Sequence, residues 1–250
     1  MITYPITRYT IIYSIKKFLI DEIQGIENLR DIHPPFLIVS NHISQLDPLL
    51  IIGSLFDIYK QKIHFIANKG NYGKLFEYFI ASKWAGCILI DFNKLPQSKK
   101  IVLLKANKII TKEKGIVSIF PEGERVPNGD DLLMGKTGVV RLALQNKIPI
   151  IPIGIYTKGE KHVIINGRKR SRIRELIKFY IQNRGKIYNK IIIGKPINIY
   201  NFWESNRNIT YTNLRMLTSR VMKNLSTLSN KHYTYYCPDH ILSNLINNGL

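Results

Sequence analysis

Short apolar runs alternate along the chain with longer segments in which apolar residues recur every three or four positions. The short runs predict buried strands, and the periodic segments predict helices that bury one face. The predicted strands span 35–40, 62–67, 86–91, 115–120, 149–155 and 190–197. The predicted helices span 74–84, 96–114, 136–145 and 214–228. Strands separated by helices predict an α/β fold with a mostly parallel central sheet, flanked by helices and joined by right-handed crossovers.

A further amphipathic helix is predicted at the N-terminus, from about Ile6 to Leu29. Its apolar stripe consists of Ile12, Ile15, Leu19, Ile23 and Ile26. Tyrosines and cations accompany this stripe at Tyr4, Arg8, Tyr9, Tyr13, Lys16 and Lys17. The pattern fits a helix that lies in a membrane interface, and it fits equally a surface helix packed onto the domain. We predict a membrane-surface helix over 1–28, with the packed surface helix as the open alternative, a main domain over 29–230 and a poorly ordered tail over 231–250.

The net charge of the chain indicates which class of molecule it binds. The 250 residues include 37 Lys and Arg against 17 Asp and Glu, a net charge of +20. Such an excess favours polyanionic partners, either nucleic acid or anionic lipid. No uncharged run reaches the roughly 18 residues of a spanning helix. The two cysteines, Cys87 and Cys237, form neither a metal-ligand spacing nor a disulfide framework, so we expect a reducing compartment and no metal.

The most informative polar residues are His42 and Asp47, directly after the predicted strand 35–40. Asp47 followed by Pro48 is typical of a helix start, with Asp47 as the cap, and this puts His42 in a strand-to-helix turn. There the carboxylate can fold back to an imidazole nitrogen, which fixes the tautomer and leaves the other nitrogen to take a proton. Taken alone, the pair is more simply explained as a polar turn before an ordinary cap, because this spacing often arises by chance.

Three further blocks follow the His42–Asp47 turn in a recognisable order. They are Gly115–Phe120 running into Pro121–Arg125, then Gly135–Ala143, then Ile148–Ile155. With these four blocks, the chain resembles the glycerolipid acyltransferase family typified by 1-acylglycerol-3-phosphate acyltransferase. The resemblance runs from about Gly25 to Pro196 and so covers most of the chain. Because ligands bind at the carboxyl ends of strands in such sheets, His42 and Glu122 are predicted to meet at one sheet edge.

The resemblance implies a role for each matching residue. His42 resembles the general base that removes a proton from an acceptor hydroxyl, and Asp47 resembles its orienting partner. The acceptor-binding block is matched by Glu122, Gly123 and Arg125, whose guanidinium suits phosphate. Lys136 matches a basic position beyond this block.

Two residues depart from the family pattern around the acceptor phosphate. Phe92 stands where the family usually has an arginine, although Lys94 is close enough in sequence to substitute for that cation. Glu124 replaces a small hydroxyl residue, and its carboxylate adds negative charge beside the expected phosphate. Both changes concern the acceptor and leave the acyl-transfer chemistry unaffected.

The resemblance implies transfer of a fatty acyl group from acyl-CoA or acyl-ACP to a lysoglycerolipid hydroxyl, most simply 1-acylglycerol-3-phosphate giving phosphatidic acid. It implies no cofactor, and a peripheral position on the cytoplasmic or stromal face of an anionic membrane. One alternative is a different acceptor, another lysolipid or glycerol 3-phosphate. Others are a lipid-binding protein without catalysis and a basic nucleic-acid-binding protein. We expect no nucleic acid partner, because no binding module is recognisable.

Overall fold

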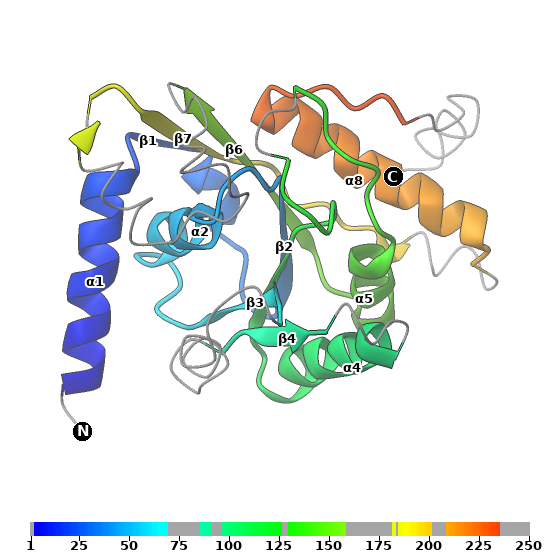
Figure 1. The fold of residues 1–250 in the computed structure, drawn as a ribbon. Coiled ribbons are helices and arrows are strands. Elements are labelled where there is room, and N and C mark those ends of the chain that lie inside the picture. Colours follow the sequence, from blue (N-terminus) through cyan, green and yellow to red (C-terminus); the bar gives the residue numbers. More distant parts are fainter. Residues whose placement is uncertain are drawn as a thin grey trace.

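The computed structural model describes residues 3–69, 86–91, 97–126, 130–158, 182–183, 185–201 and 209–235, without the side chains of residues 3–8 and 11. The elements, in chain order (Figure 1), are α1 (Thr3–Leu19), β1 (Glu22–Gln24), the 3-10 helix η1 (Ile26–Leu29), β2 (Phe36–Ser40), α2 (Asp47–Leu55), β3 (Ile63–Asn68), β4 (Ile88–Ile90), α4 (Gln97–Lys112), β5 (Ile116–Ile119), α5 (Gly138–Asn146), β6 (Ile150–Lys158), β7 (Tyr188–Ile193) and α8 (Tyr211–Ser229). The predicted helix 74–84 lies outside these residues.

The strands form one seven-stranded sheet in the order β1-β7-β6-β2-β5-β3-β4. Among the described strands every neighbouring pair is parallel except β6 with β7. The predicted α/β fold with a mostly parallel sheet is therefore confirmed. The central position of β2 between β5 and β6 places the turn after β2 in the middle of one sheet edge, where neighbouring strands can reach it.

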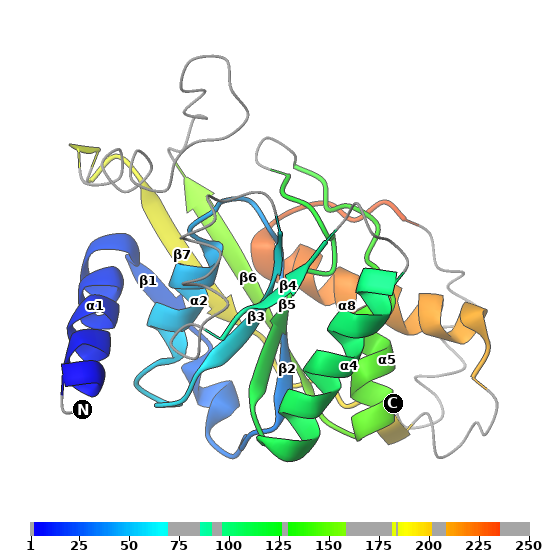
Figure 2. The same cartoon turned by 60° about the horizontal axis from the view of Figure 1, so that its bottom comes forward.

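Helices cover both faces of the sheet, and β2 shows how the sequence produces the two cores. Leu37 and Val39 face the cluster that also contains buried residues of α4, α5 and α8. Phe36 and Ile38 face the cluster that contains residues of α1 and α2. Successive strand residues point to opposite faces, so a continuous apolar run is what a strand covered on both sides requires. Figure 2 shows α1 and α2 on one side of the sheet and α4, α5 and α8 on the other.

The N-terminal segment differs from the prediction of one long helix. α1 ends at Leu19, and the chain then enters the sheet as β1, where Ile23 pairs with Ile191 of β7. The prediction of a helix continuing to Leu29 is therefore wrong beyond Leu19, because pairing with a strand distant in sequence overrides the helical spacing. The division of the chain near residue 28 stays a prediction.

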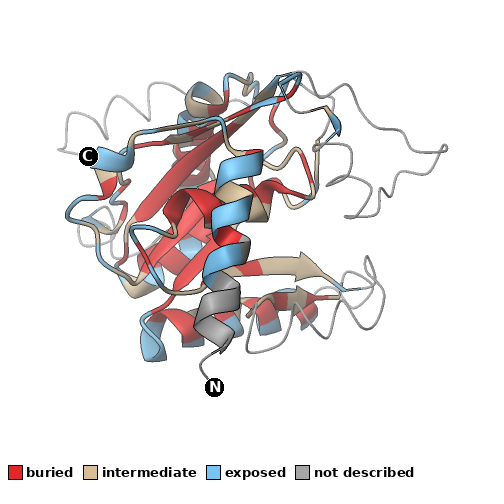
Figure 3. Cartoon of the chain, turned by 90° about the vertical axis from the view of Figure 1, so that its left-hand side faces the viewer, coloured by how far each residue is buried: buried red, intermediate tan, exposed pale blue. Residues whose placement is uncertain are grey.

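α1 itself packs on α2, and its inner face buries Ile12 and Leu19. This burial favours the packed-helix interpretation for those two stripe residues. The outward face begins at Tyr9 and Tyr13, which flank the buried residues and keep 56% and 58% of their surface accessible. Figure 3 shows this outward face pale blue over the red, buried sheet. None of the helices within the described residues is both long and apolar enough to cross a membrane.

α8, which the spacing of its leucines predicted as a core helix, packs closely on β6. Gly154 permits this approach, because a Cβ there would overlap the backbone carbonyl group of Leu228. The buried positions of α8 include Leu217, Val221 and Leu225. The segment that follows, predicted as the start of a poorly ordered tail, forms a bridge between His232 and Asp131.

Candidate active site

The turn after β2 holds His42 against Asp47, as the sequence predicted. The Asp47 carboxylate is fully buried, and its Oδ2 accepts from His42 Nδ1 at 2.7 Å. The same oxygen accepts from the backbone N–H groups of Ile43 and Ser44, at 2.8 and 2.9 Å. α2 begins at Asp47, one residue earlier than expected, and its N-cap is Leu46, so the prediction of Asp47 as the cap is wrong. Its carboxylate bends back to organise the turn instead of capping the helix.

The imidazole plane of His42 is held by an aromatic side chain. The ring stacks on Phe120 with a centroid separation of 4.0 Å and an interplanar angle of 12°. Phe65 stacks behind Phe120, with centroids 6.2 Å apart. With Asp47 at one edge and Phe120 on one face, the His42 side chain keeps 18% of its surface accessible. When Nδ1 donates to the carboxylate, Nε2 is the nitrogen that carries the lone pair of the neutral ring.

Asn41, which the sequence analysis did not select, fixes the chain just before His42. Its fully buried side chain donates from Nδ2 to the Ile155 carbonyl at 2.8 Å and accepts from the Ile155 N–H at 2.7 Å. The last backbone pair between β2 and β6 is Ser40 with Ile153. Beyond it the backbone of β2 turns away, and the side-chain amide of Asn41 supplies the next hydrogen bonds to β6. The sequence feature that could have indicated this role is the position of Asn41, directly between an apolar strand and His42. A carboxamide buried there needs partners for both its donor and its acceptor.

Glu122 joins the turn after β2 to the turn after β5. Its carboxylate, only 3% exposed, accepts the His42 N–H on Oε1 at 2.9 Å and the Leu133 N–H on Oε2 at 3.0 Å. Val126 N–H donates back to the His42 carbonyl at 2.9 Å. Burial raises the pKa of Glu122, and the two backbone donors act against that rise. The predicted meeting of His42 and Glu122 at one sheet edge is confirmed, and Leu133 is a partner that no local pattern indicated.

Gly123 lies under the side chain of Lys136. It has a φ of 78°, and a Cβ there would overlap the Lys136 ammonium group. The backbone of Lys136 is held beside this turn, because its N–H donates to the Pro121 carbonyl at 2.8 Å. Arg125 is half-buried and Glu124 is exposed. A glycine thus serves two needs here, since a side chain would be strained by the left-handed backbone and would displace the cation.

Two residues from the sequence analysis lie outside the described residues. They are Phe92, at the departure from the family pattern, and Lys94, its expected substitute. Their positions relative to His42 therefore stay predictions. Within the described ranges, no group of three or more His, Cys, Asp or Glu side chains could hold a metal ion.

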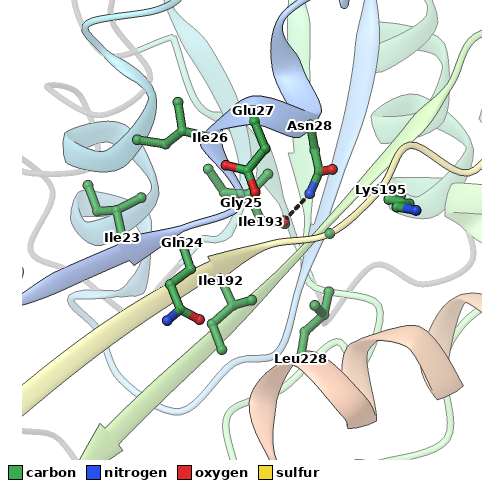
Figure 4. A pocket seen from close by; sticks show the side chains of 11 residues that line it. Ile23, Gln24, Gly25, Ile26, Glu27, Asn28, Ile192, Ile193, Lys195 and Leu228 are labelled. Atoms are coloured by element: carbon green, nitrogen blue, oxygen red, sulfur yellow. Dashed lines mark hydrogen bonds between the residues drawn. The ribbon is translucent and has the colours of Figure 1, made fainter.

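A separate hollow of about 740 Å³ lies at the other edge of the sheet (Figure 4). It is lined at the carboxyl ends of β1 and β7, where Asn28 Nδ2 donates to the Ile193 carbonyl at 2.8 Å. β7 runs antiparallel to β6, so its carboxyl end lies opposite the edge that carries His42. The hollow is therefore not part of the His42 site.

Comparison with known proteins identifies the family of this chain and agrees with its fold. An α/β domain in which a buried Asp contacts a partly exposed His at the carboxyl end of a central strand is a setting for proton abstraction from a bound substrate. The family model described as Acyltransferase matches residues 22–156, more than half of the 250 residues. The chain therefore belongs to the acyltransferase family.

Curated relatives in this family carry one common name. The 1-acyl-sn-glycerol-3-phosphate acyltransferase alpha of Mus musculus is 32% identical over 149 residues, which cover 56% of this chain and 48% of that protein. The chloroplastic 1-acyl-sn-glycerol-3-phosphate acyltransferase BAT2 of Brassica napus is 29% identical over 186 residues, covering 74% and 47%. The chain thus spans about half the length of these curated relatives.

A solved structure is similar in fold. The crystal structure of the 1-acyl-sn-glycerophosphate (LPA) acyltransferase PlsC from Thermotoga maritima superposes with a TM-score of 0.53. The alignment covers 91% of this chain and 83% of that chain, at 19% identity. At this identity the likeness supports the α/β fold alone.

Proposed function

We propose that this protein transfers a fatty acyl group from acyl-CoA or acyl-ACP to the hydroxyl of a lysoglycerolipid, most simply 1-acylglycerol-3-phosphate. The observation that carries the proposal is the 2.7 Å contact between His42 Nδ1 and the buried Asp47 carboxylate. Family membership and the names of the relatives support the acyl-transfer reaction and this acceptor. Because one ring nitrogen is committed to a carboxylate, the other is oriented to act as a base.

In the proposed reaction, Nε2 of His42 removes the proton of the acceptor hydroxyl as its oxygen attacks the thioester carbonyl. The Asp47 carboxylate stabilises the imidazolium that forms. A C–O bond forms, the C–S bond breaks, and the leaving thiolate takes the proton from His42. Base catalysis of this kind contributes about 10²–10⁴-fold. Much of the remaining rate enhancement comes from binding the two substrates next to each other in a reactive orientation, since the acceptor itself is the nucleophile.

The acceptor phosphate is proposed to bind at Arg125 and Lys136, with Lys94 as a third cation. Support comes from the turn at Gly123, which leaves space for the Lys136 ammonium group. A guanidinium and an ammonium group together neutralise a phosphate and give it several donors. The exposed carboxylate of Glu124 opposes this binding through repulsion that solvent screens.

The test of this function is an acyl-transfer assay with a panel of acceptors and both donors. The acceptors are lysophosphatidic acid, glycerol 3-phosphate, monoacylglycerol and lysophosphatidylcholine. Lysophosphatidic acid should be preferred, and His42→Ala should lower turnover at least ~10²-fold. The matched control is His33→Ala, since His33 is an exposed histidine on a loop. Preference for a neutral or zwitterionic acceptor contradicts the phosphate assignment, and full activity of His42→Ala contradicts the mechanism.

We also propose a peripheral position on the cytoplasmic or stromal face of an anionic membrane. The net charge of +20 and the exposed Tyr13 and Phe18 on the outer face of α1 support this position. Flotation with anionic vesicles should show binding that weakens with salt. The double variant Tyr13→Gln, Phe18→Gln should weaken it, whereas Tyr211→Gln, at an exposed tyrosine on α8, should not. Salt-insensitive binding, or none, contradicts the proposal.

A further inference from the structure

The residues that follow α8 return to the loop beside the active site. α8 ends at Ser229, and the left-handed backbone of its C-cap residue Asn230 (φ 54°) turns the chain back. We call Lys231–Tyr233 the strap. His232 N–H donates to the Asp130 carbonyl at 2.7 Å, and the His232 carbonyl accepts from Leu132 N–H at 2.8 Å. In Figure 1 this segment leaves the top of α8 and continues past the green loop that precedes α5.

The loop held by the strap also supplies the second donor to Glu122. Leu132 is 1% exposed, and the next N–H, that of Leu133, donates to Glu122 Oε2. Glu122 Oε1 accepts the N–H of His42. Three hydrogen bonds, joined by the peptide link between Leu132 and Leu133 and by the buried carboxylate of Glu122, thus connect the backbone of His232 with the backbone of His42.

Each end of this series is fixed by packing. Tyr233 packs on the core that lies between the sheet and α8. At the other end, the His42 ring is held by Phe120 and Asp47. Burial raises the pKa of Glu122, and the charge of Lys231 is one of the interactions that act against this rise. An ionised carboxylate makes stronger hydrogen bonds to backbone donors than a neutral one, so the strap supports Glu122 both by geometry and by charge.

We propose that the strap is a positioning element of the active site, which holds His42 in place through Glu122. Its role in turnover rests on the acyltransfer function proposed above. The strap touches no reacting atom, so its effect is on where His42 sits and not on which substrate binds. A displacement of about 1 Å at a catalytic group can lower turnover about 10²-fold, which makes a remote support of this kind measurable.

The test compares two substitutions at His232, which acts through its backbone alone. His232→Pro removes the N–H that bonds Asp130, and His232→Ala keeps it. The proline variant should lower kcat at least ~10-fold with KM for both substrates changed less than ~2-fold, and the alanine variant should behave as wild type. Equal kinetics of the two variants overturn the proposal.

A second readout does not depend on the reaction. Amide hydrogen exchange of a peptide covering residues 41–47 should be faster in His232→Pro than in His232→Ala, because the His42 N–H loses a firmly held acceptor. Unchanged exchange overturns the strap proposal even if acyl transfer is found. Faster exchange in a protein without acyltransferase activity supports the strap and contradicts the proposed function instead.

A double-mutant cycle separates action through Glu122 from general destabilisation. Glu122→Gln keeps the size of the side chain but offers only one acceptor oxygen. If the strap acts through Glu122, His232→Pro should lower kcat less in the Glu122→Gln background than in the wild type. If the reductions in kcat caused by the two substitutions simply multiply in the double variant, the strap does not act through Glu122. Where His232→Pro fails to fold by circular dichroism, Tyr233→Ala, which loosens the strap but retains its backbone donors, takes its place in the cycle.

Discussion

Glu122, beside His42, and Glu22, on the edge strand β1, both accept hydrogen bonds but in opposite surroundings. Glu122 is 3% exposed and accepts backbone N–H groups. Glu22 interacts with side chains, accepting from the Tyr188 hydroxyl and lying 3.4 Å from the Lys190 ammonium group, with 35% of its side chain exposed. Burial raises the pKa of Glu122, whereas the hydrogen bond from Tyr188 lowers the pKa of Glu22.

A hydrogen bond contributes differently at the two glutamates. The donors to Glu122 are backbone groups of two separate turns, so its carboxylate fixes the distance between them. The partners of Glu22 are long side chains at the surface, and water can replace them at small cost. We expect the same substitution to change stability and activity at the first site and to change little at the second.

The largest effect is expected at Asp47, which is even more deeply buried than Glu122. Asp47→Ala removes the acceptor for Ile43 N–H and Ser44 N–H and releases the His42 ring. Each buried donor left without a partner costs about 1–3 kcal/mol. Turnover should fall at least ~10²-fold, with a lower free energy of unfolding by urea. Turnover within twofold of wild type would show that His42 does not need its partner.

The next largest effect is expected at Glu122. Glu122→Ala leaves both His42 N–H and Leu133 N–H without their acceptor, at about 1–3 kcal/mol each. Glu122→Gln keeps one acceptor and should cost less. The acceptor KM should change much less than kcat in both variants. A change confined to the acceptor KM would instead assign Glu122 to substrate binding, as the sequence resemblance implied.

A third prediction uses the opposite pKa directions of the two glutamates. Burial raises the pKa of Glu122 above its ordinary value of 4.5, so the folded protein keeps this proton at a pH where the unfolded chain loses it. The contribution of Glu122 to stability therefore falls as pH rises above 4.5. The stability difference between wild type and Glu122→Gln should therefore shrink from pH 4 upward. For Glu22→Gln the difference should grow as pH rises towards 4.5, because the pKa of Glu22 is lowered. Urea unfolding across this range checks both signs, and equal signs would contradict the comparison.

The smallest effect is expected at the edge of the sheet. Glu22→Gln and Tyr188→Phe remove a contact between groups that solvent reaches. Turnover at neutral pH should remain at the wild-type level, and the midpoint of thermal unfolding should move far less than in Glu122→Ala. A loss of stability at Glu22 comparable with that at Glu122 would mean that the β1–β7 pairing depends on this contact.

The sequence predicted the parts of the site that local pattern determines. The apolar run before Asn41 indicated a buried strand, and the Asp47–Pro48 pair indicated a helix start, so the His42 turn followed. The true role of the Asp47 side chain depended on the backbone amides of the turn, which spacing does not describe. The two buried hydrogen bonds of Asn41 depended on β6, which is more than a hundred residues away.

The N-terminal segment shows the opposite case. Ile23 and Ile26 continue the helical spacing of α1, yet Ile23 belongs to a three-residue strand and Ile26 begins η1. A strand of three residues is too short to show alternation, and its partner β7 lies some 170 residues further along. The acceptor role of Glu122 stays a prediction, but its hydrogen bonds with His42 and Leu133 could not be predicted from its block alone, because tertiary structure brings those two N–H groups together.

The pairing of β1 with β7 has a consequence for where this folding unit can be divided. The family match ends at residue 156, but β7 begins at Tyr188 and is the sheet neighbour through which β1 is attached. A fragment cut at the end of the match would leave β1 without a described neighbour and would expose the flank of β6 that β7 covers. Such an unpaired flank is a template for association with other chains. Expression of the matched segment alone should therefore give an aggregating product, although that segment contains His42, Asp47 and Glu122.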